Sequence, residues 1–154
     1  STHPMTVSHF YEQGFTQEFD WQGTRDITSI LCAALAVEWG DNIGWDKIRN
    51  HNHALAISMQ NTLVNEWNTE PLSPLDGSLV GAMVTVQLPV GFSTESEHAD
   101  AMQLWIYEEF KVEIPIMQWQ DRAVVRASAQ LYTSSKDIQR LLIAVEASKQ
   151  HFFV

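Results

Sequence analysis

The sequence has few positively charged residues. Among 154 residues, Lys and Arg together number 9 and Asp and Glu number 19, so the formal net charge at pH 7 is −10. Nucleic-acid affinity comes mainly from clustered Lys and Arg side chains that neutralise phosphates, and no such cluster exists here. We therefore expect no nucleic-acid partner, and the same charge disfavours anionic membranes.

Cysteine and long apolar runs are also scarce. The single cysteine, Cys32, excludes an intramolecular disulfide framework and lies in the apolar run 30–35. We expect it to be a small buried hydrophobic residue in a reducing compartment. No apolar stretch reaches the length of a membrane span, and residues 1–4 do not open a secretory signal. These absences together predict a cytoplasmic protein without a membrane partner.

Apolar residues are nevertheless plentiful, and their spacing changes near residue 28. Hydrophobic residues make up 45% of the chain and charged residues 18%, which is typical of a protein that forms a core. Residues 1–27 show no sustained period and predict extended or looping chain. Helical spacing then predicts helices over about 28–40, 45–67 and 97–110, and a last one that a capping box starts at Ser134 and Asp137.

Short runs rich in β-branched residues lie between these helices. Strands are predicted over 82–88, 112–116 and 123–127, with a turn between the last two at 118–121. The element order predicts an α+β fold in which helices cover one face of a small, mainly antiparallel sheet. We divide the chain into a connecting segment, residues 1–27, and a small C-terminal domain, residues 28–154.

Four residues directly before the first predicted helix could bind an anion. Gly23, Thr24, Arg25 and Asp26 stand where backbone N–H groups and the Thr24 hydroxyl can receive a phosphate. The same residues also suit a plain turn in which Asp26 caps the helix. The local sequence leaves both interpretations open.

A second unusual position is Arg126, at the end of an otherwise apolar predicted strand. If its guanidinium is buried, it needs a carboxylate partner, from either the protein or a ligand. Histidines offer less, because His51 and His53 are two positions apart on a predicted helix and point to different faces. We predict no metal site.

Several ordered stretches of the sequence resemble one enzyme family. They are residues 3–9 (HPMTVSH), 15–26 (ending in FDWQGTRD), 81–89, 112–116 and 125–132 (VRASAQLY). Together they resemble class V aminotransferase-fold enzymes, with the greatest likeness to the isopenicillin N epimerase-like branch, and cysteine desulfurases share this fold. The resemblance covers essentially the whole chain. It implies a pyridoxal-phosphate enzyme that acts on an amino acid by epimerase, lyase/desulfurase or aminotransferase chemistry.

The resemblance also implies roles for particular residues. Gly23 and Thr24 would contact the cofactor phosphate, typically across the interface of a homodimer, and Arg25 would either join them or pair with Asp26. Arg126 would bind the substrate α-carboxylate through a bidentate fork. Many relatives carry asparagine after the tyrosine of the last stretch, whereas this chain has Thr133, so no role is carried over from that asparagine.

The resemblance further implies that this chain is the C-terminal part of a larger enzyme with a large pyridoxal-phosphate domain. The family holds its cofactor as a Schiff base on a lysine of that large domain. The four lysines present here lie outside the family's lysine motif, so we expect no catalytic residue in this chain and no activity from it alone. The alternative is a non-catalytic interaction module of the same fold.

Overall fold

The computed structural model describes residues 3, 9–20, 23 and 25–153. The chain forms two compact units, residues 1–42 and residues 43–154. Each unit is described by itself below. The sequence predicts a different division, at residue 28, between a connecting segment and a small domain. That division stays a prediction.

The first unit contains two helices, α1 (Phe15–Asp20) and α2 (Thr28–Ile43). The prediction that residues 1–27 form no regular structure is wrong for α1. Glu18 of this short helix is buried, and its carboxylate accepts a hydrogen bond of 2.6 Å from the backbone N–H of Glu12. A local polar contact of this kind is invisible to hydrophobic periodicity.

Helix α2 differs from its prediction at two points. It continues through Gly40, which the sequence marks as its stop, and ends at Ile43 before Gly44, whose φ is +98°. A single glycine inside a helix costs only about 1 kcal/mol, so Gly40 need not end it, whereas Gly44 adopts a conformation that other residues avoid. The expected burial of Cys32 is also wrong, because this side chain is exposed.

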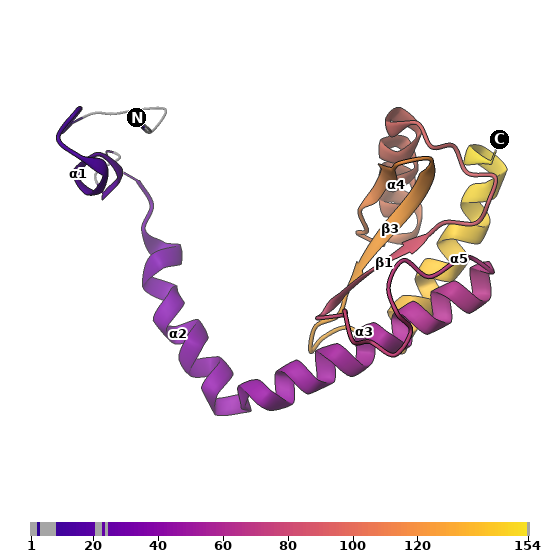
Figure 1. Ribbon diagram of the computed structural model, residues 1–154, viewed down its shortest axis with the longest axis horizontal. Helices are drawn as coiled ribbons and strands as arrows, with labels where there is room; N and C mark the ends of the chain where they lie inside the picture. The colour runs from indigo at the N-terminus through magenta and orange to yellow at the C-terminus, as the bar shows by residue number, and fades with distance from the viewer. Residues whose placement is uncertain (1–2, 4–8, 21–22, 24, 154) are drawn as a thin grey trace. The chain divides into compact units, whose positions relative to one another are not determined.

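The second unit is an α+β domain, as predicted (Figure 1). Its elements are α3 (Trp45–Trp67), β1 (Met83–Gln87), α4 (Ser96–Phe110), β2 (Ile116–Trp119), β3 (Arg122–Ser128) and α5 (Ser135–Phe152). The three strands pair in the order β1-β3-β2, and both pairs are antiparallel. Helix α3 contacts β1 and β3, α4 contacts β2, and α5 contacts both α3 and α4.

The core lies between the sheet and the helices. Side chains alternate across a strand, so Val125 and Ala127 of β3 face the core together with Val84 and Val86 of β1, and all four are buried. The opposite face of β3 carries Arg122, Val124, Arg126 and Ser128, and of these four only Val124 is buried. The predicted arrangement, with helices on one face of the sheet, is confirmed.

Strand β2 is shifted relative to its prediction. It begins at Ile116 and continues through Trp119, so the connecting turn is only Gln120 and Asp121, with Gln120 at a φ of +55°. The alternation that predicted a strand from residue 112 still buries Ile114. Proline has no N–H to donate, and Pro115 precedes the first paired residue, so regular pairing starts after it.

Helix α5 begins with the predicted capping box. Both the backbone N–H and the hydroxyl of Ser134 donate to one carboxylate oxygen of Asp137, at 2.8 Å and 2.9 Å. These bonds fix where α5 starts and therefore where the preceding turn lies. Among the described helices, none combines the length and apolarity that crossing a membrane requires.

Candidate functional site

Strand β3 holds Arg126 rigidly at its backbone and leaves its side chain exposed. The flanking residues Val125 and Ala127 are buried at 0% and 4% exposure, and Thr85 of β1 lies opposite Arg126 in the register. On the other side, the Arg126 N–H donates to the Pro115 carbonyl at 3.1 Å. The central position of β3 therefore determines both the place and the facing of this guanidinium.

The guanidinium of Arg126 is exposed. A carboxylate partner is required only for a buried guanidinium, so that requirement does not apply here. No residue that the structure describes forms an ion pair with it. An exposed guanidinium on a fixed backbone offers a planar fork of donors to a carboxylate or phosphate. This arrangement is suited to binding an anion from outside the chain.

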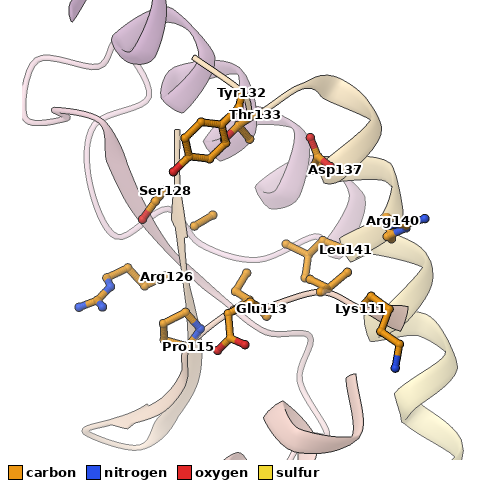
Figure 2. Close-up of a pocket in the computed structure, with 13 residues that line it drawn as sticks. Lys111, Glu113, Pro115, Arg126, Ser128, Tyr132, Thr133, Asp137, Arg140 and Leu141 are labelled. Atoms are coloured by element: carbon orange, nitrogen blue, oxygen red, sulfur yellow. The ribbon is translucent and has the colours of Figure 1, made fainter. Parts of the chain in front are cut away.

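Arg126 lines two cavities. The first, which we call the α5 cavity, has a volume of about 450 Å³ and lies between the segment before β2, the end of β3 and the start of α5 (Figure 2). The second, the sheet-face cavity, has a volume of about 390 Å³ and is lined also by Thr85, Met117, Trp119 and Val124. A ligand that reaches Arg126 can therefore extend over the sheet face or toward α5.

Most other polar groups of the α5 cavity already have partners. Asp137 is held by the capping box, whose bonds from Ser134, first from its backbone and then from its hydroxyl, lower the pKa of this carboxyl. The Lys111 ammonium donates to the Glu108 carbonyl at 2.6 Å. In Figure 2 the Arg140 side chain extends outward from α5. These groups are poor candidates for ligand contacts.

Two lining residues were not singled out by the sequence. Tyr132 is 87% exposed, and Figure 2 shows its hydroxyl directed toward Ser128. Glu113 is exposed and forms no ion pair or side-chain hydrogen bond with the described residues. In the sequence, Glu113 is a carboxylate among the alternating apolar residues of the segment 112–116. Only the fold places it beside the end of β3.

Thr133, to which no role was carried over from the resemblance, has a structural role. Its hydroxyl accepts a hydrogen bond from the Gln130 N–H at 3.2 Å, and its own N–H donates to the Gln130 carbonyl at 2.8 Å. The Gln130 side chain in turn accepts from Asn52 of α3 at 3.0 Å. Thr133 therefore closes the turn that connects β3 to α5.

The second predicted part of the site lies in the first unit. Gly23 has a φ of +89°, which glycine adopts without strain, and Arg25 is exposed. The Asp26 carboxylate accepts from the Thr28 N–H at 2.9 Å and from its hydroxyl, and these bonds, the hydroxyl first, lower the Asp26 pKa. Asp26 therefore bonds to the first residue of α2, as a residue that caps a helix does.

Thr24 lies outside the described residues, so the phosphate contact predicted for it stays a prediction. Gly23 and Arg25 belong to the first unit and Arg126 to the second, and the structure describes these two parts of the predicted site separately. Among the described His, Cys, Asp and Glu residues, no group of three or more is arranged to hold a metal ion.

The chain is similar to part of several known enzymes, and no family model matches it. A probable chloroplastic L-cysteine desulfhydrase of Arabidopsis thaliana is 32% identical over 93% of this chain and 32% of its own length. An isopenicillin N epimerase of Amycolatopsis lactamdurans is 24% identical over 84% of this chain and 31% of its own length. A probable cysteine desulfurase of Halalkalibacterium halodurans is 28% identical over 88% and 34%, respectively.

These matches confirm the predicted resemblance. The chain matches a partial region of enzymes named L-cysteine desulfhydrase, isopenicillin N epimerase and cysteine desulfurase. It spans about a third of the length of these relatives.

Proposed function

We propose that this chain is the C-terminal portion of a pyridoxal-phosphate enzyme that acts on an amino acid. The chain supplies one contact to the substrate carboxylate and others to the cofactor phosphate, and a large domain supplies the remaining groups. The names of the relatives include desulfhydrase, desulfurase and epimerase. The proposed reaction is accordingly epimerase, lyase/desulfurase or aminotransferase chemistry on an amino acid.

The observation that carries this proposal is the environment of Arg126. Its backbone is hydrogen-bonded within the sheet, and its guanidinium is exposed at the junction of two cavities without an ionic partner among the described residues. A bidentate fork gripping an α-carboxylate would fix the orientation of the substrate and hence which bond at the α-carbon is aligned for reaction.

The residues present also fit the phosphate of the cofactor. The positive φ of Gly23 permits close backbone approach, and the exposed Arg25 adds a positive charge two residues further on. The Asp26 carboxylate is already bonded to Thr28 at the start of α2. We propose that Gly23, Thr24 and Arg25 hold the phosphate, across the interface of a homodimer.

When bound, pyridoxal phosphate supplies an electron sink for negative charge that develops at the α-carbon. The lysines of this chain do not suit its covalent attachment. Lys111 is bonded to a helix carbonyl, Lys149 pairs with Glu146 at 2.6 Å, and Lys47 and Lys136 are exposed at the starts of helices. In this proposal the attached lysine belongs to the large domain, and the present chain binds and orients.

The test is the mass, visible absorbance and activity of the protein purified from its natural source. We expect a polypeptide of which this chain forms about a third, with the absorbance of bound pyridoxal phosphate. L-cysteine is the first substrate to assay, by sulfide release, because relatives carry its name, and chiral chromatography then tests epimerisation. A colourless protein of 154 residues would overturn the proposal and favour the non-catalytic module.

A further inference from the structure

Helix α2 has a large apolar surface that the rest of the first unit leaves exposed to solvent. From Ile27 to Val37 the sequence contains no charged residue. Five large hydrophobic side chains of α2 are more than half exposed: Ile30, Leu31, Leu35, Val37 and Trp39. We call these five residues the α2 apolar surface.

The α2 apolar surface extends over much of the helix circumference. With 3.6 residues per turn, its members project over an arc of roughly 200°. Glu38 and Asp41 project into the same arc near the C-terminal end of α2, so the helix is apolar all round over residues 30–37. The remaining side contains the small residues Ala33, Ala36 and Gly40 together with Cys32. An ordinary surface helix has one apolar stripe and a polar opposite face, whereas a helix that is apolar all round is normally enclosed.

Two kinds of cover can be set aside. Spanning a membrane takes about 20 apolar residues, which is nearly twice the uncharged run, and none of the described helices meets the requirement. A second copy of α2 would cover a single stripe, because a helix pair makes contact along one seam of each partner. Most of the 200° arc would stay exposed in such a dimer.

We propose that α2 is an enclosed helix of the complete enzyme, buried by the part of the polypeptide that this chain lacks. This inference rests on the proposed function, which supplies the identity of the covering partner. The relatives are about three times as long as the matched region, so they contain enough additional chain to surround one helix. The small side of α2 permits close approach of neighbouring backbone, and the α2 apolar surface fills the opposite interface.

Cys32 provides a direct probe of this burial. It is the single cysteine of the chain, it lies on α2, and it is exposed when the chain is considered alone. In the complete enzyme, purified in its native state, we expect Cys32 to react with a maleimide at least about 100-fold more slowly than after unfolding in guanidinium. Mass spectrometry of the peptide that contains Cys32 assigns the reaction to this residue.

Substitution of the α2 apolar surface provides the second test, with a matched control. Leu35 is 65% exposed on α2, and Leu104 is 58% exposed on α4, on the side away from the buried Met102 and Ile106. Leu35→Asp in the complete enzyme should lower the soluble yield at least about tenfold, because it places a charge in an enclosed apolar site. Leu104→Asp should leave the yield within about twofold of the parent.

The outcomes separate this inference from the proposed function. Slow labelling of Cys32 together with a low soluble yield of the Leu35→Asp variant supports the enclosure of α2, whether or not pyridoxal phosphate is bound. Fast labelling in a native enzyme that carries the cofactor overturns the enclosure and leaves the function intact. Slow labelling in an oligomer of the 154-residue chain alone overturns the inference as well, since the cover would then be a second copy.

Discussion

Replacement of Arg126 by lysine should reduce substrate use strongly while leaving cofactor content unchanged. Lysine keeps the positive charge but loses the planar fork, so one of two charge-assisted hydrogen bonds to the carboxylate disappears. Such a bond contributes about 1.5–3 kcal/mol. Because each 1.4 kcal/mol corresponds to a factor of ten, kcat/KM of the complete enzyme should fall roughly 10- to 150-fold.

The same strand provides a control for this experiment. Arg122 lies on the same face of β3, four residues earlier, and its guanidinium is 3.8 Å from the Asp121 carboxylate. An exposed pair of this kind contributes little, so Arg122→Lys should change kcat/KM by less than about twofold. Both variants should unfold within about 0.5 kcal/mol of the parent, because both side chains reach the surface.

The assay is steady-state kinetics with the amino acid that the natural enzyme turns over, together with cofactor content from visible absorbance. If Arg126→Lys retains at least a third of the parental kcat/KM, the assignment of the carboxylate to Arg126 is refuted. An equal loss in Arg122→Lys would refute it too, since the effect would then not be specific to the guanidinium of Arg126.

Three further substitutions test other parts of the structure. Thr24→Val in the complete enzyme should weaken cofactor retention on dialysis about tenfold, since one phosphate donor is lost, and unchanged retention would count against the phosphate contact. Ser134→Ala should lower the free energy of unfolding by about 1 kcal/mol at neutral pH. The capping bonds lower the pKa of Asp137. The stabilisation is therefore present above the unfolded pKa of about 3.9 and disappears as the pH falls through the folded pKa. The free energies of unfolding of the two proteins, from urea titrations at several pH values, should converge in acid. Gly91→Ala should destabilise the second unit by about 1–3 kcal/mol, because φ there is +115° and the new methyl group would overlap the Phe153 ring; an unchanged urea midpoint would contradict this.

Elements with strong local signals were predicted accurately from the sequence. The amphipathic spacing of residues 45–67 gave the bounds of α3, and the capping box at Ser134 gave the start of α5. The pairing of β2 could not be predicted in the same way. Its start depends on the partner strand and on Pro115, and these are tertiary constraints that the alternation of residues 112–116 does not contain.

The candidate site was predictable only in part. Arg126 stood out as a charge in an apolar strand, and its exposure follows from the register of β3. Glu113 and Tyr132 join the same cavity because β3 and the start of α5 fold against the segment before β2, which no local pattern reveals. The exposure of Cys32 has a different origin: an apolar run predicts burial, but it does not identify which polypeptide provides the cover.

The double pairing of β3 has a consequence for the entropy of ligand binding. The backbone of Arg126 is immobilised by β1 on one side and by the Pro115 carbonyl on the other, before any ligand arrives. Binding therefore restricts only the side-chain torsions, at most about 2 kcal/mol for an arginine, and folding of the sheet has already met the backbone cost. Mutations that loosen the core beneath Val125 would transfer part of that cost to the ligand, so a substitution far from any ligand could weaken its affinity.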